Sequence, residues 1–222
     1  MTNLGFSQER KILSSDTLFD LHAFMKDVSF YLLPEQFRTE YNLNQIKLIA
    51  DVYGITNQKM RNYIATTVNT GRFDTEFLRS LCAKAKLEYI KIDRSNYGVP
   101  CVTYLMTLQN GKEVTPFDKE MLYALATDYH LKPQVINVLI SHTLKRLDNR
   151  LIRKYVYAVA ADMYRNSIET ADEAVRWLTY EKKVRSRKKQ DQEDTLPVYD
   201  TSKNMVFTKE EEEELLKSIG RL

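Results

Sequence analysis

Residues 115–178 alternate helix-start signals with apolar residues at helical spacing, and this pattern restricts the fold more than any other feature of the chain. Thr115 and Pro116 combine an N-cap residue with a proline at the first helical position. Pro133 gives a similar signal for a helix over 134–147. The connections between these segments are short, so successive helices are expected to pack as neighbours. The pattern predicts an all-α fold.

A capping box gives the last start signal of this half. Thr170 and Glu173 have the spacing at which the hydroxyl and the carboxylate accept hydrogen bonds from free backbone amides. The first half carries weaker signals of the same kind. Helices are expected to start near these residues: Ser15–Asp16 (running to about Leu32), Asn42, Thr56 and Asp74. Gly54 and Gly71 are expected to end the second and third of them.

Two stretches are less clear. Residues 90–100 contain Asp93, Asn96, Gly98 and Pro100, a cluster of turn formers that predicts a boundary between two parts of the chain. Residues 102–109 read VTYLMTLQ and fit either a short strand or a helix. We leave that choice open at this point.

A weak internal repeat links the two halves. Residues 49–58 align with residues 125–134 at an offset of 76, and the match continues further along if two residues are inserted. In this alignment His130 takes the place of Gly54, which favours a role at a helix end over a role as a ligand. The repeat predicts two related helical modules.

The sequence carries no enzymatic signature. The six glycines are too far apart for a phosphate-binding or dinucleotide-binding loop, and the three histidines have no ligand spacing. Cys82 and Cys101 are widely separated and are expected to be reduced thiols. We therefore predict no enzymatic activity, no cofactor and no metal site. No apolar run is long enough to cross a bilayer, and the first residues do not form a secretory signal.

The charge is unevenly distributed. The net charge is +3 overall, but residues 98–189 contain 16 basic and 10 acidic side chains, whereas residues 190–222 contain 4 basic and 9 acidic ones. The middle of the chain can attract phosphates, and the end would repel them. Residues 190–205 are polar and are expected to be flexible, followed by a short acidic helix that begins near Thr208.

The run Leu131–Ile140 (LKPQVINVLI), the helix containing Tyr155 and the helix start at Thr170 together resemble the DnaD-like domain of Gram-positive replication-initiation proteins. Within that group the sequence most resembles the DnaB type, a helicase-loading primosome protein that is not the helicase itself. The resemblance implies two small helical modules in tandem. We place a leader at 1–14, the first module at 15–95, the second at 96–185 and a basic-then-acidic flexible tail at 186–222. A winged-helix domain usually comes first in this family, and here only the short leader precedes the first module.

The resemblance implies a function in replication initiation or restart. It suggests a cytoplasmic primosome component that binds single-stranded or duplex DNA without sequence preference and assists loading of the replicative helicase. The implied protein partners are the DnaD-type protein, a helicase-loading ATPase and the helicase. It also allows a homo-oligomer and peripheral membrane association without an integral membrane segment. Two alternatives remain: a replisome scaffold without direct DNA binding, and a phage or regulatory relative.

The family carries a DNA-binding motif that aligns with Tyr155, Val159 and Met163 on one helical face. Met163 stands where the family has tryptophan, and it cannot stack on a base as an indole does. The alternative is that this face belongs to the core. If the motif functions here, Tyr155 is expected to stack or to hydrogen-bond, with neighbouring cations binding phosphates: Arg153, Lys154 and Arg165.

Other basic side chains form two clusters. One surrounds a predicted turn between two helices and consists of Lys145, Arg146, Arg150, Arg153 and Lys154. The other is a run at the end of the last helix: Lys182, Lys183, Arg185, Arg187, Lys188 and Lys189. Both can bind a phosphate backbone without reading sequence. The alternative is a solvated helix end, where cations also interact favourably with the helix dipole.

Overall fold

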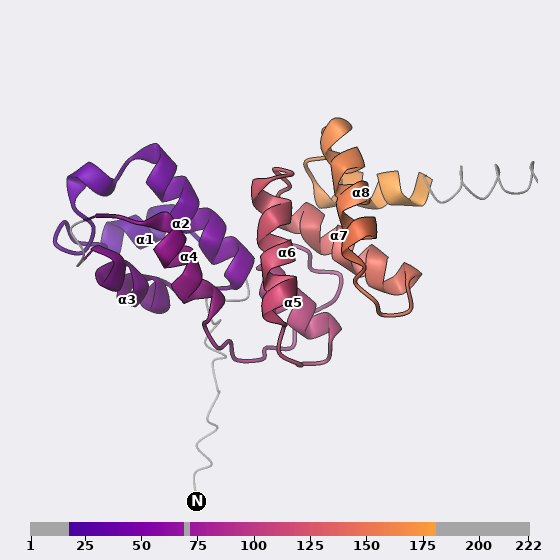
Figure 1. Cartoon of the computed structure of the whole chain (residues 1–222), viewed down its shortest axis with the longest axis horizontal. Coiled ribbons are helices and arrows are strands. Elements are labelled where there is room, and N and C mark those ends of the chain that lie inside the picture. Colours follow the sequence, from indigo (N-terminus) through magenta and orange to yellow (C-terminus); the bar gives the residue numbers. More distant parts are fainter. Residues whose placement is uncertain (1–17, 69–71, 181–222) are drawn as a thin grey trace, which may run out of the picture. The chain divides into compact units, whose positions relative to one another are not determined.

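The computed structural model describes residues 18–68 and 72–180, and within these ranges the fold is all-α without a β-strand (Figure 1). This agrees with the predicted fold class. The elements are α1 (Leu21–Asp27), the short 3-10 helix η1 (Glu35–Phe37), α2 (Glu40–Tyr53), α3 (Asn57–Val68), α4 (Thr75–Ala83), α5 (Cys101–Leu108), α6 (Pro116–Thr127), α7 (Pro133–Arg146) and α8 (Arg153–Arg165). Residues 171–180 are also helical. The acidic segment predicted near Thr208 lies outside the described residues.

The predicted capping residues hold most of the helix starts. The Asp74 carboxylate accepts from the backbone N–H groups of Glu76 and Phe77 at 2.9 and 3.0 Å. Thr115 Oγ1 accepts from Asp118 N at 3.1 Å, and Pro116 occupies the first turn of α6. The capping box before 171–180 is also present, because Glu173 accepts from the backbone N–H of Thr170 and Thr170 accepts from that of Glu173.

The first helix differs from the prediction. It begins after Asp20, whose carboxylate accepts from Ala23 N at 2.9 Å, and it ends at Asp27, short of Leu32. Val28 is extended, and the following loop is held by Arg38, whose guanidinium donates to the carbonyls of Val28 and Leu33. A distant side chain therefore stabilises the loop, and local sequence does not reveal such a contact.

The stretch that fitted strand or helix is α5. All its residues from Cys101 to Thr107 are buried, so it lies in the interior and turns none of its faces to solvent. That composition lacks the one-sided periodicity that distinguishes a surface helix from a strand. The helix ends at a turn in which Asn110 and Gly111 have φ values of 56° and 85°.

The helix starts recur at the spacing of the predicted repeat. The helices α2 and α3 begin at Glu40 and Asn57, and α6 and α7 begin 76 residues later at Pro116 and Pro133. The helices α4 and α8 begin 78 residues apart, which matches the two inserted residues. Gly54 and its counterpart His130 both have positive φ, 68° and 51°. The repeat therefore extends to the backbone conformation at corresponding helix ends.

The helix α2 packs against α4 on one side and against α5 and α6 on the other, so one continuous core runs through residues 18–68 and 72–179. The Tyr53 ring of α2 stacks on the Tyr123 ring of α6 with centroids 5.8 Å apart. Gly54 adopts a left-handed conformation, and a Cβ there would lie 2.6 Å from Thr103 Oγ1 of α5. Glycine at this position therefore allows the left-handed conformation that ends α2, and it leaves room for the close approach of α2 to α5.

The connection between α4 and α5 is irregular, as its turn formers predict, but it is held in place. Asn137 of α7 is fully buried, and its amide donates to the carbonyls of Tyr97 and Val99 at 2.9 and 2.8 Å. The Tyr104 hydroxyl donates to the carbonyl of Arg94 at 2.8 Å. The polar Asn137 inside an apolar run thus satisfies backbone groups of a neighbouring loop.

A buried carboxylate anchors the start of the described chain. Asp51 of α2 accepts from Phe19 N at 2.6 Å and from Lys47 Nζ at 2.7 Å. Burial raises the pKa of Asp51 above its ordinary value, although both of these contacts act in the opposite direction. The carboxylate is therefore satisfied but desolvated.

Candidate nucleic-acid interface

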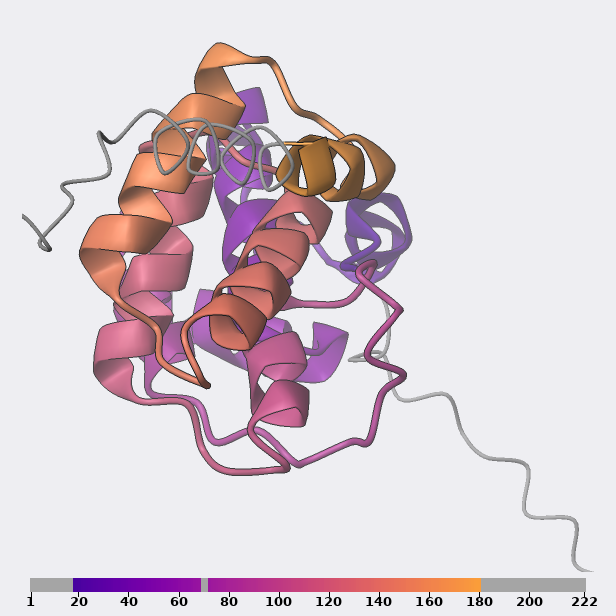
Figure 2. The same cartoon turned by 90° about the vertical axis from the view of Figure 1, so that its right-hand side faces the viewer.

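The loop that joins α7 to α8 positions the basic side chains of the second half. The helices α6, α7 and α8 lie side by side in both views (Figures 1 and 2). Asp148 and Asn149 both adopt left-handed conformations, with φ values of 49° and 61°. Asn149 N donates to the carbonyl of Leu144 at 2.8 Å, and Arg150 N donates to that of Leu147 at 3.0 Å. These bonds close α7 with a tight turn, so α8 starts only a few residues later.

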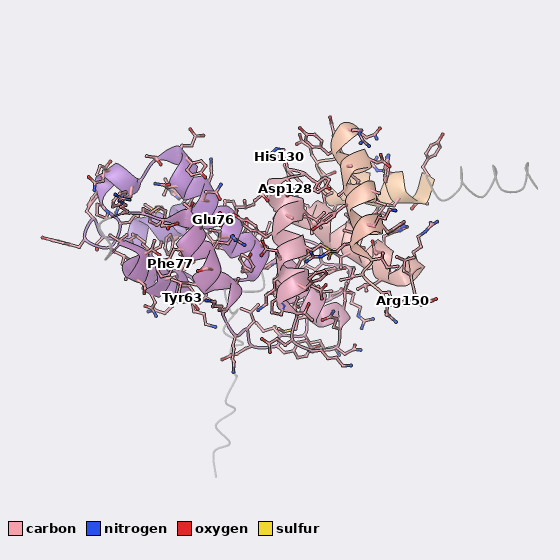
Figure 3. The ribbon with its side chains drawn as sticks, in the orientation of Figure 1. Tyr63, Glu76, Phe77, Asp128, His130 and Arg150 are labelled. Carbon is pink, nitrogen blue, oxygen red and sulfur yellow. The ribbon has the colours of Figure 1, made fainter. Side chains whose placement is uncertain are left out.

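Exposed cations surround this loop. We define the basic turn as Lys145, Arg146, Arg150 and Lys154, all of which are exposed. None of them forms an ion pair with another residue of the described part of the chain. Figure 3 labels Arg150 at the loop between the two helices. The basic turn therefore presents four cations that form no ion pair within residues 18–68 and 72–180, and the one carboxylate in the same loop is that of Asp148.

The start of α8 adds to this positive potential. Its N-cap residue, Ile152, provides no side-chain hydrogen bond, and the first turn contains no acidic residue. Free backbone N–H groups at a helix start favour anions. Lys145 and Arg146 lie in the last turn of α7, where they also interact favourably with the helix dipole. That interaction accounts for two of the four cations, but not for Arg150 and Lys154.

Arg153, also predicted to bind phosphates, is engaged elsewhere. Its guanidinium lies over the Phe117 ring, with Cζ 3.1 Å from the ring centroid, and it donates a hydrogen bond to the Phe117 carbonyl. Its Nε atom is buried and has no hydrogen-bond partner among the described residues. Arg153 thus links the start of α8 to the start of α6.

Arg165 lies at the far end of α8, apart in sequence from the basic turn. Its guanidinium forms an ion pair with Asp162 at 2.6 Å, and its side chain is 69% exposed. An exposed pair of this kind is weak and can be exchanged for a phosphate contact. Its local positive charge is nevertheless partly neutralised.

The aligned motif face points largely into the protein. Met163 and Val159 are 0% and 6% exposed and belong to the core, which leaves them no free surface for a base in this conformation. Tyr155 is half-buried, and the Arg146 guanidinium lies 5.9 Å from its ring centroid. Among the three, only Tyr155 has surface to offer, and a cation already lies near its ring.

The second basic cluster, Lys182 to Lys189, lies outside the described residues. In the sequence this run follows the helix over 171–180, in which Ala174 and Leu178 are buried and Trp177 is packed against the core. The contribution of this run to binding stays a prediction.

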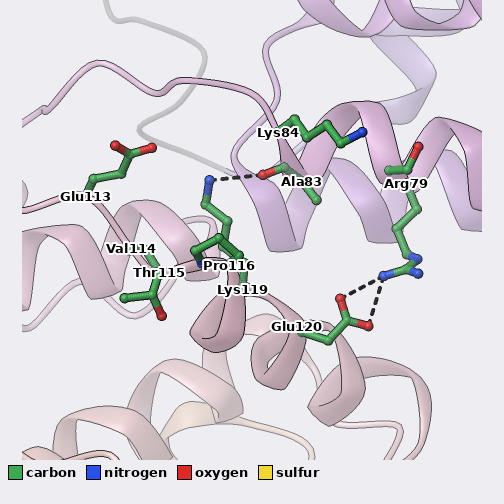
Figure 4. A pocket seen from close by; sticks show the side chains of 10 residues that line it. Arg79, Ala83, Lys84, Glu113, Val114, Thr115, Pro116, Lys119 and Glu120 are labelled. Carbon is green, nitrogen blue, oxygen red and sulfur yellow. Dashed lines mark hydrogen bonds and ion pairs between the residues drawn. The ribbon is translucent and has the colours of Figure 1, made fainter.

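A cavity of about 690 Å³ lies between the end of α4 and the start of α6 (Figure 4). Three of its five charged lining residues have partners: Arg79 contacts the Glu120 carboxylate at 2.9 Å, and Lys119 Nζ donates to the Ala83 carbonyl at 3.0 Å. Arg79 also forms an ion pair with Glu76. These contacts link the end of α4 to the start of α6, and the lining mixes cations with carboxylates, so it does not present a surface of one charge.

The two cysteines are free and buried. Burial raises the pKa of Cys82 to about 12 and also raises that of Cys101, so neither thiol is activated as a nucleophile. Within residues 18–68 and 72–180, no group of three or more His, Cys, Asp or Glu residues is placed to hold a metal ion. No helix in those ranges has the length and apolar character needed to traverse a bilayer.

The fold and this surface define an all-α protein whose second half presents cations on a tight interhelical turn. Residues 105–176 match the DnaB_2 family model, described as replication initiation and membrane attachment. This confirms the resemblance to the DnaD-like domain over the second half of the chain. The family is a non-catalytic primosome family. No solved structure matches the chain.

The sequence did not single out Phe117. The residue lies four positions before Met121 and eight before Leu125, both buried, so helical spacing places it on the core side of α6. It is instead 63% exposed, because it occupies the first turn and extends past the end of the core. The sequence signal is the repeat, whose offset of 76 aligns Phe117 with another aromatic residue, Tyr41. In the structure Tyr41 is equally exposed.

Proposed function

We propose that this protein is a primosome component that binds DNA without sequence preference and assists loading of the replicative helicase. The basic turn is the observation that carries the DNA-binding part of this proposal. Its four exposed cations lie beside an uncapped helix start within a domain of a replication-initiation family. Point charges at the end of two helices suit a phosphate backbone and carry no sequence information.

We further propose that the chain consists of two related helical modules, 15–95 and 96–185, followed by a flexible tail with a short acidic helix. The recurring helix starts at offsets of 76 and 78 residues support a duplication. The sequence of the first module has no counterpart of the basic turn, because residues 69–74, between α3 and α4, contain Arg72 as their single cation. The second module would then bind DNA, and the first would serve other contacts.

The resemblance to the family supports a proposal about partners. We propose contacts with the DnaD-type protein, a helicase-loading ATPase and the helicase, with self-association as a further contact. The family description includes membrane attachment. A cytoplasmic location with peripheral membrane association fits that description.

A titration with labelled single-stranded and duplex oligonucleotides tests the DNA-binding part. At about 50 mM salt the proposal requires binding of random sequences with similar affinity, and a steep loss as salt rises. Replacing the six cations of the run at 182–189 by glutamine should weaken binding relative to the natural chain at the same salt concentration. Absence of any binding at low salt would refute DNA binding and would leave a protein-interaction scaffold as the function.

A further inference from the structure

Phe117 is an exposed aromatic ring held by a cation at the edge of the basic turn. It lies in the first turn of α6 and is 63% exposed. The Arg153 guanidinium covers part of the ring and also donates to the Phe117 carbonyl, so the side chain is fixed from one side. Most of the residue still faces solvent. Exposure of a large apolar ring to water is unfavourable in free energy, and a binding partner that covers the ring removes this penalty.

The charged surroundings indicate what kind of partner fits. Lys154 directly follows Arg153 in α8. Arg150 lies three residues before Arg153, a chain length of at most about 11 Å. Arg146 is drawn toward the same helix start through its position near Tyr155. Ile152, between Arg150 and Arg153, is itself 46% exposed. An apolar platform bordered by exposed cations that form no ion pair among the described residues suits a polymer with flat rings and a phosphate backbone.

We infer that Phe117, fixed by Arg153, is a stacking platform for an unpaired base of single-stranded DNA bound at the basic turn. This rests on the proposed DNA binding and specifies the strand form that the site prefers. Successive bases stack on aromatic side chains and on arginine planes in proteins that bind single strands without sequence preference. The bases of a duplex are stacked on one another, so a duplex offers phosphates to the cations but no free base to the ring.

This assignment differs from the motif-based expectation in the residues that meet the base. Val159 and Met163 are buried, whereas Phe117 is open and Arg153 lies on it. Arg153 thus acts through the ring, and the basic turn supplies the phosphate contacts.

The repeat provides a matched control. Tyr41 occupies the corresponding position in the first turn of α2 and is 64% exposed, almost the same as Phe117. No cation lies over the Tyr41 ring among the described residues. Tyr41→Leu therefore removes an equally exposed aromatic ring from a surface without the basic turn.

The experiment compares Phe117→Leu, Phe117→Tyr and Tyr41→Leu in the full chain. Leucine keeps an apolar contact under Arg153 and removes the aromatic face, and tyrosine retains that face. Affinities are measured by fluorescence anisotropy with three probes of equal length: single-stranded DNA, the corresponding duplex, and a strand with abasic sites throughout. Circular dichroism establishes that each variant is folded.

We expect Phe117→Leu to weaken binding of single-stranded DNA by about fivefold or more, the scale of one lost base–aromatic stack. Binding of the abasic strand and of the duplex should change by less than about twofold, since phosphate contacts remain. Phe117→Tyr and Tyr41→Leu should bind single-stranded DNA like the natural chain.

The result that overturns the inference is equal affinity of Phe117→Leu and the natural chain for single-stranded DNA. An equal loss on normal and abasic strands also overturns it, because the ring would then act without a base. If the natural chain binds none of the three probes at low salt, the proposed DNA binding itself fails. These outcomes separate loss of the stacking platform from loss of the whole interface.

Discussion

Neutralising the basic turn should change the salt dependence of DNA binding by a calculable amount. The perturbation is the replacement of Lys145, Arg146, Arg150 and Lys154 by glutamine. All four are exposed and without ion pairs in the described part of the chain, so their removal leaves no carboxylate unpaired there. Arg153 and Arg165 are excluded from the set because each already has a partner.

The magnitude follows from counterion release. Each phosphate contact contributes about 0.7 to the slope of log affinity against log salt for single strands. Loss of four contacts should therefore reduce the slope by up to about 3. Between about 50 and 200 mM salt, the affinity advantage of the natural chain over the variant should shrink by up to about 50-fold.

The assay is fluorescence anisotropy with a labelled single strand at several salt concentrations. A control variant replaces four exposed lysines on other surfaces: Lys26, Lys86, Lys91 and Lys112. It loses the same net charge, so it measures the effect of overall charge alone. If both variants show the same slope, the cations of the basic turn do not contact phosphates, and the placement of the interface is refuted.

Three further predictions concern the fold. Met163→Ala should lower the free energy of unfolding by about 2–5 kcal/mol in urea denaturation, because the side chain is fully buried; a loss below about 1 kcal/mol would indicate that it is exposed in solution. Cys82 and Cys101 should react with a thiol reagent at pH 8 only as fast as the protein unfolds, since burial raises both pKa values; rapid labelling of the native chain would contradict this. Burial raises the folded-state pKa of Asp51, so the folded state binds a proton more readily than the unfolded state between that pKa and the ordinary value of 3.8. The contribution of Asp51 to stability should therefore rise as pH falls through this window. Urea midpoints at neutral and acidic pH should show that Asp51→Asn lacks this contribution, and a parallel pH dependence of both chains would refute it.

Local signals predicted the helices wherever capping chemistry determines them. Asp74, Thr115 and Thr170 each accept from the backbone N–H groups that their spacing indicated. The end of α1 was missed because Arg38, ten residues beyond Val28, holds that loop. The helix α5 remained ambiguous because burial on all sides removes the periodic pattern that identifies an amphipathic element.

The candidate interface was predicted in part. The cations around the α7–α8 turn follow from sequence, because a break between two helices brings their flanking residues together. The engagement of Arg153 by Phe117 joins residues 36 positions apart, and no local pattern encodes it. The burial of Val159 and Met163 depends on which neighbours cover α8, so helical spacing alone left their role open.

The position of α2 has a consequence for experiments that divide the chain. Its apolar side chains meet α4 on one side and α5 and α6 on the other, and Tyr53 stacks on Tyr123. A fragment ending near residue 95 would expose the apolar side chains of α2 that pack against α5 and α6, and such a surface promotes aggregation. The complementary fragment would lose the helix that covers α5 and α6. Truncated fragments would therefore bind other proteins nonspecifically in partner mapping. Point substitutions in the intact chain leave the contacts of α2 with α4, α5 and α6 in place.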